Sequence, residues 1–162
     1  MTKSDNNKET DLQKFPSFNL MAAHTDKEIS ISEKELKAQK FLVYTYPKDL
    51  TSGCTKETNE FSNNLDFFTA NGIAIYGLSK DSIKSHLKFI DKEKIPFPLI
   101  SDPDCTLIKA LGCWVKKSMY GKEYMGISRS TFLVNESLQV NKIWRNVKVK
   151  DHVSNVMAEI SM

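Results

Sequence analysis

The stretch "YPKDLTSGCTKE", residues 46–57, holds a cysteine whose position favours reactive chemistry. The β-branched and aromatic run before it predicts a buried strand over 41–46, and the pattern after it predicts a helix that begins near Ser52. Cys54 would then lie in the first turn of that helix, where unpaired backbone N–H groups and the helix dipole favour an anion. Because the thiolate is the nucleophilic form of cysteine, this position predicts a reactive role for Cys54.

A free cysteine taken at random is more often a small buried hydrophobic residue than a nucleophile. The neighbours of Cys54 argue against that interpretation. Ser52, Thr55 and Lys56 are polar. Gly53 has no side chain and would let a ligand come close to the backbone. A reactive role is therefore the favoured interpretation of this cysteine.

The elements that must position this turn follow from the spacing of apolar residues. Phe61, Leu65 and Phe68 recur at helical spacing, and Asn71-Gly72 supplies a left-handed stop. The predicted order along the middle of the chain is strand 41–46, helix 52–70, strand 73–79, helix 81–92, strand 97–101 and helix 103–112. Strands that alternate with helices in this way indicate a parallel sheet with helices on both faces.

The two ends of the predicted domain add antiparallel strands. Period-two alternation within 18–32 predicts an N-terminal β-hairpin, and 130–144 predicts a second hairpin around the turn "NES". Asp102 is expected to cap helix 103–112, and Asp151 a last helix. The glycine-punctuated stretch 116–126 is interpreted as a flexible loop near the site or a surface excursion. These elements predict an α/β, thioredoxin-like fold: a central mixed β-sheet flanked by helices, with an N-terminal β-hairpin.

Length and composition set the domain organisation and exclude several classes of function. The chain has 162 residues, of which 40% are hydrophobic and 27% charged, enough for one domain with its own core. Residues 1–14 are polar and are expected to form a flexible tail before a single domain over 15–162. The net charge of +3 is spread along the chain, so no nucleic-acid partner is expected.

The localisation is expected to be cytoplasmic, with no membrane partner. No stretch approaches the ~18 apolar residues of a membrane span, and the N-terminus has no apolar leader region. Three cysteines are too few for a secreted disulfide framework, which favours a reducing compartment. His24, His86 and His152 have no metal-ligand spacing and are interpreted as solvated or capping residues.

The cysteine stretch resembles the active-site segment of the peroxiredoxins, whose signature is Pro-x-x-x-Thr/Ser-x-x-Cys. Pro47, Thr51 and Cys54 match that signature. The stretches "FPLISDPD", "YGKEYMGISRSTFLV" and "VKVKDHVSNV" are similar to the bacterioferritin-comigratory or Q-type branch of the same family. The resemblance covers nearly the whole chain from about Phe15.

The resemblance implies a thiol-dependent peroxidase that reduces hydrogen peroxide and organic hydroperoxides without a metal or prosthetic group. Cys54 would be oxidised to sulfenic acid, with the Thr51 hydroxyl beside the sulfur. Arg129 would reach the sulfur and both peroxide oxygens with its forked donors, where a surface arginine is the alternative. Pro47 would shield the sulfur from water as well as end the strand. Glu57 would orient Arg129, or would simply be a solvated first-turn carboxylate.

The same resemblance leaves the reduction of Cys54 open. Many Q-type relatives carry a resolving cysteine five residues later, where this chain has Asn59, and others carry it on the next helix, where 81–92 has none. Cys105 and Cys113 would lie ~12 Å apart along one helix, beyond the ~7 Å that a disulfide spans, so they should not pair. Cys105 shares the sheet edge with Cys54 and could resolve it only after local unwinding; Cys113 is farther still.

The favoured hypothesis is therefore a one-cysteine mechanism in a monomer. An external thiol, such as thioredoxin, glutaredoxin or a small-molecule thiol, would regenerate Cys54. A dithiol oxidoreductase would need Cys-x-x-Cys, and Glu57 stands where the second thiol would be. A non-catalytic thioredoxin-fold redox sensor or binding protein remains an alternative.

Overall fold

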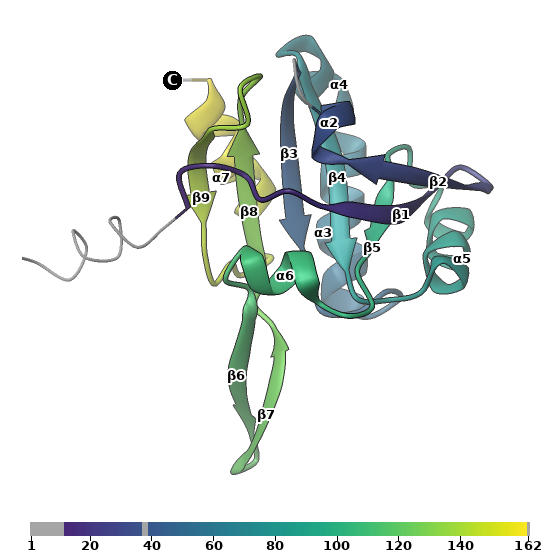
Figure 1. The fold of residues 1–162 in the computed structure, drawn as a ribbon, viewed down its shortest axis with the longest axis vertical. Helices are drawn as coiled ribbons and strands as arrows, with labels where there is room; N and C mark the ends of the chain where they lie inside the picture. Colours follow the sequence, from purple (N-terminus) through teal and green to yellow (C-terminus); the bar gives the residue numbers. More distant parts are fainter. Residues whose placement is uncertain (1–11, 37–38, 162) are drawn as a thin grey trace, which may run out of the picture.

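A computed structural model describes residues 12–36 and 39–161 (Figure 1). Residues 1–11 of the expected tail lie outside the described part of the chain. The last residues of the expected tail are described, and they contact the domain: Leu12 packs against the core, and Lys14 forms an isolated antiparallel bridge with Gln139. Among the described residues, contacts with the domain are thus already made at Leu12, three residues before Phe15.

The core of the fold is a seven-stranded mixed sheet with the strand order β2-β1-β5-β4-β3-β8-β9. Its strands are β1 (Asn19–His24), β2 (Lys27–Ser32), β3 (Lys40–Thr45), β4 (Ile73–Ser79), β5 (Leu99–Ser101), β8 (Ser130–Val134) and β9 (Val140–Trp144). β3, β4 and β5 are parallel, whereas β1 and β8 join them antiparallel. The predicted thioredoxin-like fold is confirmed, including the N-terminal hairpin of β1 and β2.

Helices cover both faces of this sheet, as Figure 1 shows. They are α2 (Glu33–Leu36), α3 (Ser52–Asn63), α4 (Leu65–Ala70), α5 (Ile83–Glu93), α6 (Thr106–Ala110) and α7 (His152–Ile160). Alternate residues of β3 enter two separate clusters: Phe41 and Val43 pack with α2 and α6, and Leu42 and Tyr44 pack with α3, α4, α5 and α7. Because successive strand residues point to opposite faces, these clusters are the two sides of the sheet.

Two predicted helices differ from the observed ones, one because it is divided and the other because it is shorter. The expected helix 52–70 is divided at Asn64, whose backbone N–H bonds back to Phe61 and closes α3. The expected helix 103–112 contains only α6, because Cys105 adopts a left-handed conformation with φ 59°. Asp102 still caps this turn, since its carboxylate accepts the backbone N–H groups of Thr106 and Ile108.

The stretch 116–126, interpreted from the sequence as a loop, is a β-hairpin. β6 (Trp114–Met119) pairs antiparallel with β7 (Lys122–Ile127), and the pair projects away from the body of the fold in Figure 1. The two turn residues, Tyr120 and Gly121, both have positive φ, of 52° and 79°, as a two-residue hairpin turn of type I′ requires. Both strands are largely exposed, so they lack the alternation that marks a half-buried strand.

No helix in the described ranges 12–36 and 39–161 has the length and apolar character needed to cross a bilayer.

Gly77 of β4 tests how closely this sheet packs. A Cβ there would lie 2.6 Å from Leu99 Cδ2 and 3.0 Å from the Tyr44 hydroxyl, both of which belong to buried side chains. We expect Gly77→Ala to lower the free energy of unfolding by about 1–3 kcal/mol, measured by urea denaturation. The matched control is Gly126→Ala, whose Cβ would meet the flexible chain of Lys117 on the projecting hairpin. Equal losses in both variants would contradict this account.

Candidate active site

Cys54 lies at the start of α3, which the loop of residues 46–51 joins to the carboxyl end of β3. Thr51 is the N-cap of the helix, with extended φ and ψ of −81° and 156°, so Cys54 is its third residue. Only 1% of Cys54 is exposed, and its side chain packs in the same cluster as Tyr44 and Phe61. The thiol is thus buried among apolar groups while it sits beside the first-turn N–H groups of a helix.

Arg129, the residue directly before strand β8, brings a cation to this sulfur. Its Nη2 donates to Cys54 Sγ at 3.4 Å, and its Nη1 donates to Glu57 Oε1 at 2.5 Å. The backbone of Arg129 is held in place because its carbonyl accepts the N–H of Val147 at 2.8 Å. One planar guanidinium therefore joins the sulfur and a carboxylate, which a lysine ammonium could not do with the same geometry.

Glu57 is the buried member of this arrangement, one helical turn beyond Cys54. Burial raises its pKa from 4.5 to about 7, although the Arg129 cation acts in the opposite direction. Burial alone would lower the pKa of Arg129, but Glu57 and Cys54 raise it above its ordinary value. Glu57 Oε2 has no hydrogen-bond partner among the described residues. The solvated-carboxylate alternative for Glu57 is therefore wrong: 0% of the residue is exposed.

Gly53 lies against the guanidinium. A Cβ at Gly53 would lie 3.5 Å from Arg129 Nη2 and 3.8 Å from Val149 Cγ2, so a side chain there would cover the cation. Pro47 is half-buried and lies two residues after the end of β3, in the loop that leads to α3. Cys54, Arg129, Glu57 and Gly53 are thus brought together by the fold.

The Thr51 hydroxyl is directed to its own loop. Thr51 Oγ1 donates to the carbonyl oxygen of Lys48 at 2.8 Å, and the residue is exposed. The hydrogen of the hydroxyl is therefore engaged, and the lone pairs of the oxygen are the part that can accept a further hydrogen bond.

Comparison with known proteins agrees with this geometry. The profile of the AhpC/TSA family matches residues 12–143. The chain belongs to this family. It is 40% identical over 148 residues to the putative peroxiredoxin bcp of Coxiella burnetii, covering 91% of this chain and 96% of that one, and 39% identical over 145 residues to peroxiredoxin Bcp of Bacillus subtilis, covering 90% of each.

Solved structures give the same assignment. Peroxiredoxin Q of Xanthomonas campestris is 38% identical, with a TM-score of 0.82 and coverage of 89% of both chains. A structure of the X. campestris bacterioferritin comigratory protein, described for its alkyl peroxide reduction activity, also shows 38% identity and a TM-score of 0.82, over 89% of this chain and 90% of that one. The chain is a peroxiredoxin of the Bcp or Q type.

The other two cysteines of this peroxiredoxin lie away from Cys54. Cys105 and Cys113 are buried in the cluster that contains Phe41 and Val43, on the opposite face of the sheet. Burial raises the pKa of both thiols above the ordinary value. The structure therefore separates both from Cys54 by the sheet itself.

Asn59 occupies the position at which many Q-type relatives are expected to carry a resolving cysteine. Its Nδ2 donates to Glu93 Oε1 at 3.0 Å, which ties α3 to the end of α5.

Lys117 of β6 is a residue near the site that sequence reasoning missed. Its pKa is lowered first by burial and then by the Arg129 cation, and it is raised by Cys54, which means that the lysine lies within the field of both groups. The hairpin brings this second cation to the site. Once 116–126 was interpreted as a loop, no signal in the sequence assigned Lys117 a position.

The interpretation of all three histidines as solvated or capping is wrong for His86 and His152, which are buried. His152 Nε2 lies 2.8 Å from Thr131 Oγ1, and burial followed by the Arg129 cation lowers its pKa to about 4. His86 is wholly buried against Asp49, at 2.7 Å. Contacts over such long sequence separations leave no local spacing by which the histidines could be recognised.

The buried Glu57 makes stability depend on pH. Its pKa is raised to about 7, so between about pH 4.5 and 7 the folded state keeps a proton that the unfolded state has lost, and the free energy of unfolding falls as pH rises through this window. We expect Glu57→Gln to remove about 2 kcal/mol of the fall between about pH 5 and pH 8, in urea denaturation at a series of pH values. Asp66→Asn, at an exposed position of α4, is the control and should keep the wild-type slope. An unchanged slope in Glu57→Gln would show that Glu57 does not titrate in this window.

Proposed function

We propose that this peroxiredoxin reduces hydroperoxides by nucleophilic attack of Cys54 on the O–O bond. The observation that carries the proposal is the guanidinium of Arg129, which donates to Cys54 Sγ and to buried Glu57 at the same time. This contact places a fixed positive charge 3.4 Å from a buried sulfur, and a low-dielectric site strengthens its interaction with negative charge that develops during the attack.

The chemical step follows from these contacts. The thiolate of Cys54 forms a bond to the nearer peroxide oxygen, the O–O bond breaks, and the departing oxygen takes the electron pair and a proton to leave as water or an alcohol. Cys54 becomes a sulfenic acid. Arg129 stabilises the negative charge that develops on the departing oxygen, because its donors are already fixed by Glu57.

Thr51 and Pro47 are proposed to frame the substrate. The Thr51 hydroxyl donates to Lys48, so its oxygen is oriented to accept the O–H of a hydroperoxide. Pro47, half-buried at the end of β3, keeps water from the sulfur. Gly53 leaves room beside Arg129 for the peroxide oxygens. Hydrogen peroxide and alkyl hydroperoxides are the proposed substrates, and the activity described for the X. campestris relative supports the second of these.

A one-cysteine mechanism is proposed for the return of Cys54 to its reduced form. Cys105 and Cys113 lie on the other face of the sheet, and the expected resolving position holds Asn59. An external thiol, whether thioredoxin, glutaredoxin or a small molecule, would attack the sulfenic sulfur, and the enzyme would act as a cytoplasmic monomer. The alternative in which Cys105 resolves Cys54 requires one of them to leave its core cluster.

Activity measurements test the roles of Cys54 and Arg129. We expect Cys54→Ser to abolish peroxide consumption with a thiol reductant in excess. Arg129→Lys should lower the second-order rate of Cys54 oxidation about 10–100-fold, since one charged hydrogen bond contributes ~1.5–3 kcal/mol. Arg145→Lys is the matched control, because Arg145 donates to the Leu111 carbonyl and lies near Cys113. Turnover by Cys54→Ser at the wild-type rate would refute catalysis by Cys54, and oxidation of Cys54 without turnover would favour the redox sensor.

Intact-mass analysis after one equivalent of peroxide tests the one-cysteine mechanism. We expect a gain of one oxygen, trapped by dimedone on Cys54, and no loss of two hydrogens. A Cys54–Cys105 disulfide would contradict this expectation.

Asn59→Cys should add an intramolecular disulfide to this reaction. The introduced thiol lies five residues from Cys54, about 7.5 Å along the helix axis, so the first turn of α3 must unwind for the bond to form. Asn63→Cys is the control, since nine residues place its thiol about 13.5 Å along the axis. Disulfide formation in both variants would indicate general unfolding of α3.

A further inference from the structure

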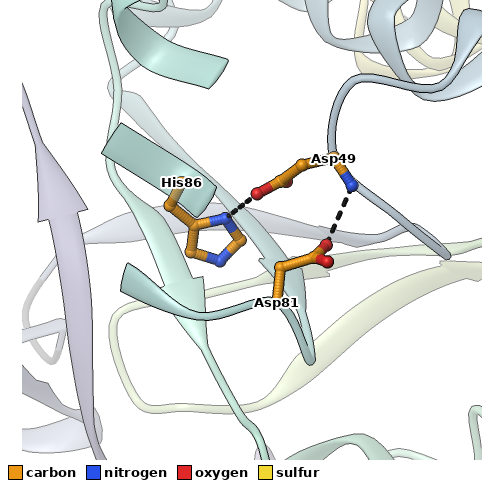
Figure 2. A group of neighbouring side chains, drawn as sticks. All are labelled: Asp49, Asp81 and His86. Carbon is orange, nitrogen blue, oxygen red and sulfur yellow. Dashed lines mark hydrogen bonds and ion pairs between the residues drawn. The ribbon is translucent and has the colours of Figure 1, made fainter. Parts of the chain in front are cut away.

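The loop that leads into Cys54, residues 46–51, is fixed to the neighbouring β4–α5 connection by a buried polar cluster (Figure 2). Asp49 and His86 are 4% and 0% exposed. His86 Nδ1 lies 2.7 Å from Asp49 Oδ2, and His86 Nε2 lies 3.0 Å from the carbonyl oxygen of Ile100. The backbone N–H of Asp49 donates to Asp81 Oδ2 at 2.8 Å. Both the side chain and the backbone of Asp49 are therefore anchored.

Asp49 and His86 must hold a proton between them. A carbonyl oxygen only accepts, so His86 Nε2 carries a hydrogen, and the 2.7 Å contact with the Asp49 carboxyl needs a second one. Wherever that second hydrogen rests, the pair as a whole is neutral. This neutrality makes full burial of the two groups tolerable.

The cluster is a hydrogen-bonded anchor and not a set of open metal ligands. Ligand atoms of Asp49, Asp81 and His86 lie within 4.8 Å of one another. They are already engaged: the Asp49 carboxylate also accepts from the hydroxyls of Tyr46, at 2.6 Å, and Ser85, at 2.9 Å. Asp81 Oδ2 accepts from Ser79 Oγ at 2.7 Å as well as from the loop.

The loop that this cluster holds has a conformation its own sequence does not favour. Leu50, the residue between Asp49 and the helix N-cap Thr51, has φ 67°, in the left-handed region that a side chain with a Cβ disfavours. Its side chain is 43% exposed and gains little from burial. The anchors on Asp49 therefore impose the loop geometry that delivers Thr51 and the first turn of α3.

Oxidation of Cys54 by a hydroperoxide and its reduction by a thiol require different conformations of the 46–51 loop. Cys54 is 1% exposed, so a hydroperoxide must fit within the closed site, whereas a thiol reductant needs the sulfur to be uncovered. We propose that the Asp49–His86 pair is a latch that holds the 46–51 loop closed over Cys54 and thereby sets the balance between these states. The inference rests on the proposed peroxidase function, and both residues act as positioning residues because neither contacts the sulfur.

Loss of either Asp49 or His86 is expected to open the loop. The remaining member would be left in a buried site without its partner, which is costly unless water reaches it. Lys48, Leu50 and Thr51 of the loop are already exposed, so residues 48–51 can lift toward solvent, whereas buried Tyr46 stays with the sheet because its backbone N–H donates to the carbonyl oxygen of Leu78. Lifting also relieves the left-handed Leu50.

Asp49→Asn and His86→Gln test the latch through two rates measured on the full chain. The first is the second-order rate of Cys54 oxidation by hydrogen peroxide in a single turnover. The second is the rate at which a bulky maleimide labels reduced Cys54, quantified on the peptide that contains it. We expect oxidation to slow about tenfold or more and labelling to accelerate about tenfold or more. Ser85→Ala, which removes one hydrogen bond to Asp49, should move both rates in the same directions by a smaller factor.

Asn59→Ala is the matched control, because it removes a hydrogen bond between α3 and α5 that does not involve the loop. Both of its rates should stay within about twofold of wild type. Unchanged rates in the Asp49, His86 and Ser85 variants would overturn the latch. A parallel fall in both rates, with lower thermal stability, would also overturn it, because a merely structural role would not separate the two.

The labelling rate needs no peroxidase activity and so keeps this inference separate from the proposed function. If peroxide fails to oxidise wild-type Cys54, the peroxidase proposal fails, and the effect of Asp49→Asn on labelling still decides whether the pair holds the loop.

Discussion

The structure depends on one interaction in particular: the guanidinium of Arg129 held between a sulfur and a buried carboxylate. Arg129 and Cys54 are 75 positions apart in the chain, and antiparallel pairing of β8 with β3 brings them together. Without Arg129, Glu57 would be an unpaired buried acid, and the sulfur of Cys54 would lie in an apolar cluster without this cation beside it. The pairing of β8 with β3 therefore brings the charge of Arg129 to the site, and the start of α3 sets the position of the sulfur.

The sheet also decides which thiols can meet. Helices on opposite faces place the cysteines: Cys54 lies in α3, whereas Cys105 and Cys113 flank α6 on the other face, although Cys105 follows a strand that is parallel to β3. Sharing a sheet edge is therefore a weaker constraint than sharing a face. The sequence argument used the edge and left resolution by Cys105 open, whereas burial of the side chains argues against it.

The elements that the sequence predicted well are those with a local signal. β3, β4 and the start of α3 follow from apolar runs and turn residues, and the signature around Cys54 indicated which residues to examine. The histidine His86 lacked such a signal, since its partner Asp49 is 37 positions away. The β6–β7 hairpin was missed because its strands are largely exposed, so neither face carries the apolar pattern of a buried strand. Long-range polar contacts and projecting hairpins are the features that local periodicity does not encode.

The separation of the three cysteines by the sheet has a kinetic consequence. A resolving thiol on the same chain acts at an effective concentration of about millimolar or higher, whatever the composition of the surroundings. In a one-cysteine cycle that constant internal supply is absent, so the lifetime of the sulfenic acid varies inversely with the concentration of external thiol. Further oxidation by peroxide competes during that lifetime. The oxidised fraction of Cys54 would then follow the ratio of peroxide to thiol around the protein.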